Sequence, residues 1–316
     1  PISPPPLLPH PPSSSSPHSV VLDAPEEESF EFAAARGSNF LKYGRYGKPK
    51  IKLLRVDPKS GKVENWNLSH DVGAIALRKD GGAVLANDDG FYFYDFESED
   101  LELITLIDEG EPRSRLNDGK VDRRGRFFAG GMDDLEEKGL CSLYRLDPDL
   151  TVTKVDDGIV CSNGPCWSPD DKTFYFADTF QGEFWAYDYD IETGDVSNKR
   201  VFATTHDDIG VADGSTVDAE GYMWNAQVTG GELVRYAPDG SVERRIGMPV
   251  KNITSVIFGG DNMDEIYVTS MARVAHPGAD AHGHFAVESK PQFAAGGLFR
   301  ITGLGIQGVP ETRFGG

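Results

Sequence analysis

The sequence predicts an all-β fold, a six-bladed β-propeller. Three observations point to it. Turn signals, each followed by a run of aromatic and β-branched residues, recur along the chain. They recur in pairs, with a period of about 45 residues, and such a period is typical of propeller blades. The 316 residues also include 36 glycines and 20 prolines, which favour short strands and tight turns over long helices.

One series of turn signals supplies the inner hairpin of each blade. Each member places an aspartate and two or three turn residues before an apolar run, as in KVDRRGRFFAGG (120–131) and TVDAEGYMWNAQV (216–228). The gaps between successive turn aspartates are 42, 48, 48 and 43 residues. The turn aspartates of this series are Asp80, Asp122, Asp170, Asp218 and Asp261.

A second series of turns alternates with the first and supplies the outer hairpins. Its aspartates are Asp57, Asp147, Asp190 and Asp239, and the stretch near Asp95 fills the gap in the series. Each period therefore holds two hairpins, or four strands, which is the composition of one blade. Five inner hairpins are visible. A sixth blade, closed by the two ends of the chain, completes the predicted ring.

The beginning of the chain differs in composition from the rest. Residues 1–28 are rich in proline and serine and are predicted to be a disordered tail, because they cannot bury enough apolar surface to offset the entropy lost on ordering. They have neither the charged region nor the apolar region of a signal peptide. The predicted propeller domain spans residues 29–316.

Charge and cysteine content exclude several classes of function. The net charge is −20 and the pI is near 4.7, so nucleic acid and anionic membranes are unfavourable partners. No apolar run reaches the roughly 18 residues of a membrane span. Cys141, Cys161 and Cys166 are too few for a disulfide framework and are predicted to be reduced thiols. We expect a cytoplasmic monomer.

Short polar clusters precede the inner hairpins at similar offsets. They lie four to seven residues before the turn aspartate. Because innermost strands line the central channel of a propeller, the clusters should converge at one mouth of that channel. Their residues are Arg115-Leu116-Asn117-Asp118-Gly119, Ser162-Asn163-Gly164, Asp213-Gly214-Ser215 and Thr254-Ser255.

Converging amide and carboxylate oxygens suit a hard divalent cation. Asparagine and aspartate oxygens bind calcium, magnesium, manganese or zinc. A cation with an open position can polarise a carbonyl group, and a neighbouring carboxylate can act as a general base toward water. Taken singly, each Asn-Gly or Asp-Gly pair is an ordinary turn signal. Three pairs in register beside an arginine indicate a site for one divalent cation.

The same segments resemble a known family. RLNDGKVDRRGRFFAGGM (115–132), SNGPCWSPDDKTFYFADT (162–179) and ADGSTVDAEGYMWNAQV (212–228) are similar to the regucalcin (senescence marker protein), gluconolactonase and luciferin-regenerating-enzyme family. The similarity extends over roughly residues 50 to 308. It implies a six-bladed propeller with one divalent metal on its axis and a sugar lactone as substrate.

The resemblance also implies roles for individual residues. Asn163 and Asp213 match two metal ligands, and Asp213 also matches the general base. Arg115 and Asn117 match residues that hold the substrate. In the implied reaction the metal binds the lactone carbonyl while Asp213 assists the attack of water.

The chain departs from the family pattern near its beginning. The family's third metal ligand lies in a Gly-Glu-x-Pro segment that is absent here; by spacing, Glu31 is the nearest candidate, and the run Glu26 to Glu28 is a weaker one. The stretch 40–52 lacks the usual aromatic–aspartate ending, so the first blade is predicted to be atypical. Some members place a glutamate after the Gly-x-Met segment. Which acid takes that place is left open among Asp133, Asp134, Glu136 and Glu137.

Three functions are compatible with these residues. The leading one is a metal-dependent sugar-lactone hydrolase. The second is a non-catalytic calcium- or ligand-binding propeller with an incomplete metal site, which the missing segment would produce. The third is a hydrolase of other esters on the same scaffold. His276, His282 and His284 form an apparent metal motif, but the surrounding glycines predict an exposed insertion.

Overall fold

The computed structural model describes residues 31–35, 51–271 and 296–316, the first of these segments through its backbone only. All regular elements in these ranges are strands, which confirms the all-β prediction. The predictions for the tail of residues 1–28, for the run Glu26 to Glu28 and for the loop with His276, His282 and His284 concern residues outside the described ranges.

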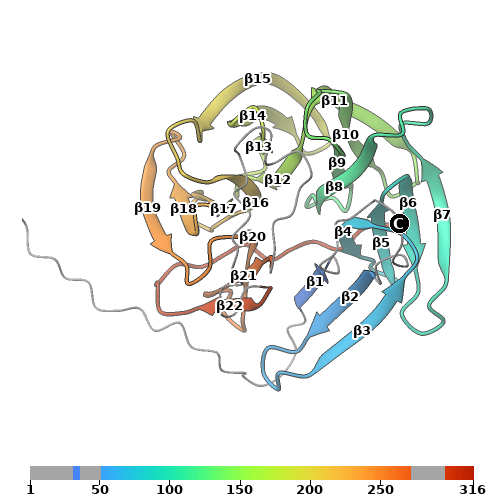
Figure 1. The fold of residues 1–316 in the computed structure, drawn as a ribbon, viewed down its shortest axis with the longest axis horizontal. Helices are drawn as coiled ribbons and strands as arrows, with labels where there is room; N and C mark the ends of the chain where they lie inside the picture. Colours follow the sequence, from blue (N-terminus) through green and yellow to red (C-terminus); the bar gives the residue numbers. More distant parts are fainter. Residues whose placement is uncertain (1–30, 36–50, 272–295) are drawn as a thin grey trace, which may run out of the picture.

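The strands form antiparallel sheets arranged around a central axis (Figure 1). Three sheets contain four consecutive strands that follow the predicted pairs of hairpins. They are β4 (Val72–Leu77), β5 (Ala83–Asn87), β6 (Gly90–Tyr94) and β7 (Leu101–Leu106); β8 (Ser114–Val121), β9 (Phe127–Asp133), β10 (Cys141–Leu146) and β11 (Val152–Ile159); and β12 (Ser162–Trp167), β13 (Thr173–Asp178), β14 (Glu183–Asp190) and β15 (Asp195–Thr204).

The remaining sheets complete the ring. One more has four strands, β16 (Val211–Val217), β17 (Met223–Val228), β18 (Glu232–Tyr236) and β19 (Val242–Gly247). The next has three strands, β20 (Ile253–Gly259), β21 (Glu265–Ser270) and β22 (Leu298–Ile301). The first sheet also has three, β1 (Glu31–Ala35), β2 (Ile51–Val56) and β3 (Val63–Leu68).

The predicted number of blades requires a correction. Five blades, those that begin with β4, β8, β12, β16 and β20, start with an inner strand of the predicted pattern. The sheet β1–β2–β3 is not a sixth blade of this kind, because residues 36–50 separate its first two strands and no strand precedes β1 in the described residues. A propeller is therefore confirmed, but six regular blades are not.

The five inner strands carry the same irregularity. Each breaks its pairing with the following strand by a β-bulge in its first half, between Val72 and Ala74, Leu116 and Asp118, Asn163 and Cys166, Ala212 and Ser215, and Ile253 and Ser255. A bulge turns the strand locally and re-aims its side chains. In four of the five blades it coincides with the polar cluster singled out in the sequence, so repeated bulges direct these clusters toward the axis.

The ends of the axis have different structures. We call the end at which the inner strands begin the mouth, and the end with the inner hairpin turns the turn end. Most of the predicted turn aspartates hold their loops by accepting backbone N–H groups. Asp122 Oδ1 accepts from Arg124 (2.9 Å) and Asp218 Oδ1 from Glu220 (3.0 Å). In the outer series, Asp190 Oδ1 accepts from Glu192 (2.8 Å).

Apolar side chains fill the space between neighbouring blades. Phe127, Phe128, Phe174 and Trp224 are fully buried, as expected for residues that pack one blade on the next. The ring of Phe128 meets that of Trp167 edge-on, with centroids 5.2 Å apart. Such contacts bury large areas of aromatic surface and supply most of the stabilisation between sheets.

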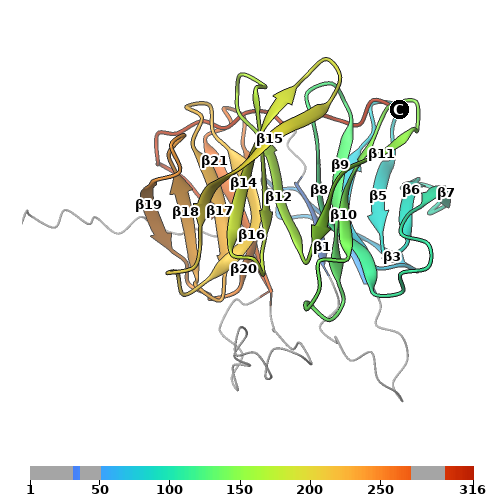
Figure 2. The same cartoon turned by 90° about the horizontal axis from the view of Figure 1, so that it is seen from above.

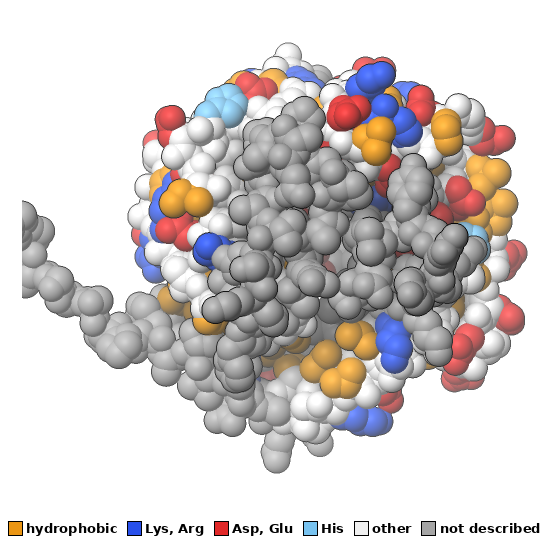
Figure 3. All heavy atoms as spheres, viewed as in Figure 1, with side chains coloured by type: hydrophobic (Ala, Val, Ile, Leu, Met, Phe, Trp, Pro, Cys, Tyr) orange, Lys and Arg blue, Asp and Glu red, His pale blue; other side chains and the backbone are white. Residues whose placement is uncertain are grey.

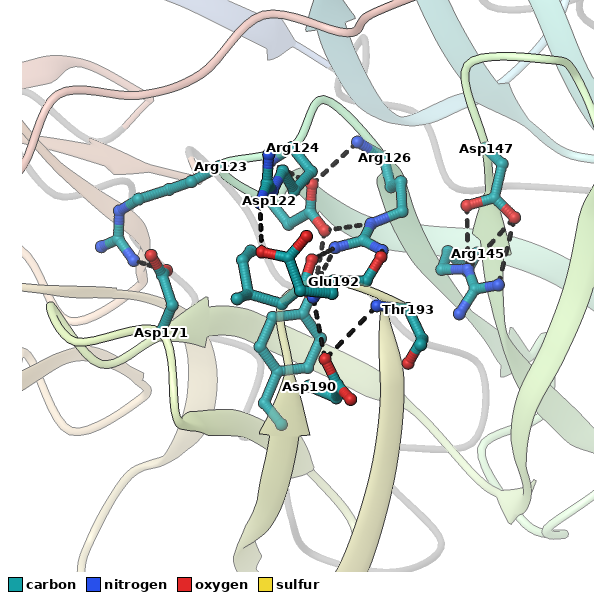
Figure 4. A network of polar contacts seen from close by, with 12 residues as sticks. Asp122, Arg123, Arg124, Arg126, Arg145, Asp147, Asp171, Asp190, Glu192 and Thr193 are labelled. Carbon is teal, nitrogen blue, oxygen red and sulfur yellow. Dashed lines mark hydrogen bonds and ion pairs between the residues drawn. The ribbon is translucent and has the colours of Figure 1, made fainter.

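A polar network joins two blades at the turn end (Figure 4). The buried Arg126 donates from Nε to Asp122 Oδ2 (2.5 Å) and from Nη2 to Tyr189 OH (3.1 Å), so it connects the β8–β9 turn with strand β14. Arg123 pairs with Asp171, and Arg124 pairs with Glu192 in the next blade. Because the central guanidinium is buried and fully engaged, removal of Asp122 would leave an uncompensated charge.

Residues 302–316, which we call the closing segment, run along the turn end (red in Figure 2). Gly308 N donates to Met263 O (2.7 Å) beside the last blade, and Phe314 N donates to Leu77 O (2.8 Å) in strand β4. Phe314 is fully buried among Phe91, Phe127 and other residues of the first two complete blades. The segment therefore ties the last blade to the first complete one.

Charged side chains of both signs lie around the rim of the face shown in Figure 3. Exposed ion pairs, such as that between Arg200 Nη1 and Asp188 Oδ1 (2.8 Å), contribute little to stability. Within the described ranges, the chain has no helix that is long and apolar enough to cross a bilayer.

Candidate functional site

Three consecutive inner strands bring the predicted site residues together near the mouth. Asn117 lies on β8, Asn163 on β12 and Asp213 on β16, each in the bulged first half of its strand. Asn117 Nδ2 lies 3.2 Å from Asn163 Oδ1, and Asn163 Oδ1 lies 3.1 Å from Asp213 Oδ1. The predicted convergence of the polar clusters is thus observed.

Glycines allow the inner strands to approach closely. A Cβ atom on Gly164 would lie 2.3 Å from Ser215 Oγ, and one on Gly214 would lie 2.4 Å from Ser255 Oγ. Gly164 also has φ of +62°, a conformation that residues with a side chain rarely adopt. The Asn-Gly and Asp-Gly pairs therefore serve a packing role in addition to their turn chemistry.

Thr179 decides the orientation of the Asn163 amide. The Thr179 hydroxyl has one proton, and it donates that proton to the backbone oxygen of Ala212 (2.8 Å). The Asn163 atom 2.7 Å from Thr179 Oγ1 must then be the donor Nδ2, so Oδ1 faces Asp213. The flipped amide would donate to Asp213, but it would require the hydroxyl proton that Ala212 already accepts. We therefore assign the orientation in which two oxygens face each other.

Two acceptor oxygens at this distance repel each other unless a cation or a proton lies between them. The backbone oxygen of Ser162 lies 3.1 Å from the same Asn163 atom and adds a third acceptor. Amide, carboxylate and carbonyl oxygens are the ligands that hard divalent cations prefer. The residues present at the mouth therefore fit one divalent cation held by Asn163 and Asp213.

The electrostatics of the axis support the same conclusion. Burial in the axis, together with the negative charge of Asp118, raises the pKa of Asp213 well above its usual range. Burial also raises the pKa of Asp118, although the N–H groups of Gly164 and Gly119 oppose the effect. Two neighbouring buried carboxylates are costly without a compensating positive charge, which Lys120 supplies in part to Asp118 and which a divalent cation would supply to Asp213.

Arg115 positions Asn117. It is buried, and its Nη1 donates to Asn117 Oδ1 (3.0 Å) while its Nε donates to Asp134 Oδ1 (3.1 Å). Asn117 Nδ2 in turn donates to Ser162 O (2.9 Å). Both predicted substrate residues thus lie at the mouth, and the guanidinium orients the amide that would meet the substrate.

The structure distinguishes the four acids after the Gly-x-Met segment. Asp133 pairs with Arg113 and accepts the N–H groups of its own loop, and Asp134 bonds Arg115. Glu137 is exposed beside Arg113. Burial raises the pKa of Glu136 to about 7 even though the charge of Arg115 opposes the rise. Glu136 is therefore the acid whose charge can change near neutral pH beside the site.

The cysteines are free thiols, as predicted, and all three are buried. Cys161 lies within the site, where its Sγ is 3.6 Å from Asn163 Nδ2 and 3.8 Å from Asn117 Nδ2. Burial raises the pKa of this thiol well above its usual value, so the sulfur is a neutral, weak acceptor for both amides.

The third metal ligand stays a prediction. Among the side chains that the structure describes, no group of three or more His, Cys, Asp or Glu residues is arranged to hold a metal ion. The side chain of Glu31 lies outside that set, but its backbone is placed. Glu31 begins β1 and pairs with Val56, whereas Ala35 pairs with Lys52 near the mouth. This register places the backbone of Glu31 nearer the turn end than that of Ala35, and the role of Glu31 as a ligand stays a prediction.

Sequence reasoning did not select Asp118 or Thr179. Asp118 Oδ2 accepts the N–H of Gly164 (2.7 Å), and thereby fixes the residue after Asn163. Its position in the Asn-Asp-Gly cluster was a usable signal, because that cluster precedes an inner turn. Thr179 follows strand β13 and carries no such signal, since its role depends on contact with a strand 33 residues away.

Comparison with known proteins agrees with this arrangement. Residues 49–272 match the family model described as the SMP-30/Gluconolactonase/LRE-like region. The chain belongs to the SMP-30/gluconolactonase/LRE-like family. Regucalcin of Xenopus laevis is 38% identical over 271 residues, covering 84% of this chain and 88% of the relative. Human regucalcin is 35% identical over 274 residues, covering 85% and 89%.

Solved structures of the family share the fold. A calcium-binding protein, regucalcin, from Agrobacterium tumefaciens superposes with a TM-score of 0.74 at 30% identity, covering 83% of this chain and 86% of that one. A luciferin-regenerating enzyme gives the same TM-score at 26% identity, covering 84% and 88%. These similarities confirm the family inferred from the polar motifs.

Proposed function

We propose that this family member is a metal-dependent hydrolase of sugar lactones. The observation that carries the proposal is the pair of oxygens on Asn163 and Asp213, 3.1 Å apart, in the amide orientation that Thr179 requires. The pair lies beside Arg115 and Asn117. The chain belongs to a family named partly for gluconolactonase, which supports a sugar lactone as the substrate.

Asn163 and Asp213 would hold the cation, which we expect to be calcium, magnesium, manganese or zinc. When bound, such a cation supplies Lewis-acid polarisation of the lactone carbonyl. Arg115 and Asn117 orient the substrate through its hydroxyl and carbonyl oxygens. Asp213, ionised once its charge is compensated, stands where it can accept a proton from water.

The reaction balances with these groups. The oxygen of water forms a bond to the carbonyl carbon while Asp213 takes the proton. The bond between that carbon and the ring oxygen then breaks, and the ring oxygen receives the proton. The product is the open-chain hydroxy acid, which releases one proton to solution at neutral pH.

The test is proton release from glucono-, galactono-, xylono- and arabinono-lactone, first with EDTA and then with each cation restored. We expect turnover that EDTA abolishes and a cation restores. Asp213→Asn removes the base and a charged ligand and should lower kcat by about 10²- to 10⁴-fold or more. Asp207→Asn, an exposed aspartate on the preceding loop, is the matched control and should leave kcat unchanged.

A second function follows from a different observation. Among the described side chains, the acidic ligand set is incomplete, and several relatives are named regucalcin. A calcium-binding propeller without lactone turnover is therefore the alternative. Calcium binding by folded protein, together with no proton release under any cation, would establish the alternative and refute the hydrolase.

Two structural proposals accompany the function. The sheet β1–β2–β3, whose strand β1 contacts β4, closes the ring beside the five regular blades. The second proposal is that the third ligand of the metal site comes from the segment before β2. The monomeric state, the cytoplasmic location and the absence of nucleic-acid and membrane partners stay predictions.

A further inference from the structure

Lys120 lies on the axis between the candidate site and the turn end. It follows Asn117 by three residues on strand β8 and is mostly buried. Lys120 Nζ donates to Glu311 Oε1 (2.9 Å). Nothing in the proposed reaction uses this residue.

The side chain of Lys120 reaches from its own strand to a strand two blades away. Its Nζ also donates to the backbone oxygen of Ser215 (3.2 Å), which lies on strand β16 two residues after Asp213. Strand β12 packs between β8 and β16, so the contact joins two strands that are not neighbours in the ring. One ammonium group therefore links the strand of Asn117 to the strand of Asp213.

The closing segment supports this link from the turn end. Glu311 belongs to residues 302–316, and a small cavity lined by Lys120, Cys166 and Glu311 lies beneath the segment. Burial opposes the charge of Lys120, but Glu311 and other nearby acids hold its pKa above the usual value. Lys120 therefore stays a cation, with one hydrogen bond to each of its two partners.

The contact between Lys120 and Ser215 lies close to the bulge that contains Asp213, so it can affect the position of Asp213. Gly164 packs against Ser215, and Asp118 holds the N–H of Gly164, so the three strands meet with little spare space. A shift of Ser215 moves the residues around the bulge that contains Asp213. Metal ligands are sensitive to shifts in the neighbouring residues that orient them.

We propose that Lys120 and Glu311 form a positioning strut that sets the spacing of β8 and β16, and with it the distance between Asn163 and Asp213 at the metal site. The inference rests on the proposed function, because it assumes that these two residues hold a divalent cation. It assigns Lys120 a role in positioning, since its ammonium group touches neither the substrate nor the reacting atoms.

The experiment compares Lys120→Met, Lys120→Arg and Glu311→Gln in the full chain. Lys199→Met is the control, because Lys199 forms a pair of similar length with Asp156 on outer strands, 2.7 Å against 2.9 Å for Lys120 and Glu311. The affinity for Mn²⁺ is measured by electron paramagnetic resonance, the folded fraction by circular dichroism, and kcat and KM by proton release. These readouts separate metal binding from stability and from catalysis.

We expect Lys120→Met to weaken Mn²⁺ binding by about 10- to 100-fold, as for other residues that orient metal ligands. At saturating Mn²⁺, kcat should fall more than KM changes, because the base is displaced while the substrate contacts persist. Lys120→Arg keeps a charged donor and should lie closer to wild type than Lys120→Met. Glu311→Gln should weaken binding in the same direction but less, and Lys199→Met should have no effect.

Failure of the inference is distinguishable from failure of the proposed function. If wild-type protein binds no Mn²⁺, the proposed metal site is wrong. If wild type binds Mn²⁺ and folded Lys120→Met binds it equally well with the same kcat, the strut is refuted. Should Lys120→Met not fold, Glu311→Gln decides: unchanged affinity and unchanged kcat would overturn the inference.

Discussion

Gly164 offers the sharpest test of how the site is built. An alanine at this position would meet two independent obstacles. Its backbone has φ of +62°, which costs a residue with a side chain about 1–2 kcal/mol. Its Cβ would lie 2.3 Å from Ser215 Oγ, 2.8 Å from Ser215 Cβ and 3.1 Å from Asp213 O. Overpacking of this kind costs about 1–3 kcal/mol.

The sum predicts that Gly164→Ala lowers the free energy of unfolding by about 2–5 kcal/mol. Two glycines serve as matched controls. Gly110 has φ of +97° with nothing within 4 Å, so Gly110→Ala measures the backbone strain alone. Gly247 has neither obstacle and gives the baseline. The readout is the midpoint of urea unfolding, with the m-value checked for constancy.

A second substitution isolates the contact between the strands. Ser215→Gly removes both side-chain atoms that the new Cβ would strike, although it also loses the bond from Asn225 Nδ2 (3.0 Å). In a double-mutant cycle, we expect a favourable coupling of about 1–3 kcal/mol between Gly164→Ala and Ser215→Gly. Zero coupling, or a Gly164→Ala variant as stable as Gly247→Ala, would refute the close packing of β12 on β16.

Two further predictions concern burial. Because burial raises the pKa of Glu136 to about 7, folded protein ionises this group less readily than unfolded protein, so wild-type stability should fall as pH rises from about 4.5 to 7. Glu136→Gln should remove about 2 kcal/mol of that fall, after a discount for solvent screening of the partly exposed group. The control Glu137→Gln should leave the fall unchanged. Equal urea midpoints for wild type and Glu136→Gln at pH 8 would contradict this prediction. Phe314→Ala should cost about 3–5 kcal/mol in urea unfolding, because the ring fills the core between two blades, and a cost under 1 kcal/mol would exclude that packing.

Local sequence patterns predicted much of the propeller. The turn aspartates act through bonds to residues two to four positions away, as Asp122 and Asp218 do, so their signal is contained in a short window. Equal offsets before these turns were enough to place Asn117, Asn163 and Asp213 together, because equivalent strands of a propeller face one axis.

What the sequence did not predict depends on distant contacts. The pair between Lys120 and Glu311 joins residues 191 positions apart, and no periodicity reports it. The bulges were also missed, since two of them lie where Gly164 and Gly214 meet serine side chains of the next inner strand, Ser215 and Ser255. The prediction of six regular blades was wrong because the repeat of paired hairpins is lost before residue 63. The described strands there include no inner hairpin of the predicted kind.

The closing segment has a consequence for the order in which the fold can be completed. Phe314 fills a core shared with Phe91 and Phe127, and Arg78 Nε donates to the backbone oxygen of Gly316 (3.0 Å), 238 positions further along the chain. During synthesis, the first two complete blades emerge long before Phe314, whose side chain packs between them. The part of this core that Phe314 fills stays open until residue 314 has been made, so a nascent chain presents an uncovered apolar site between these two blades until then.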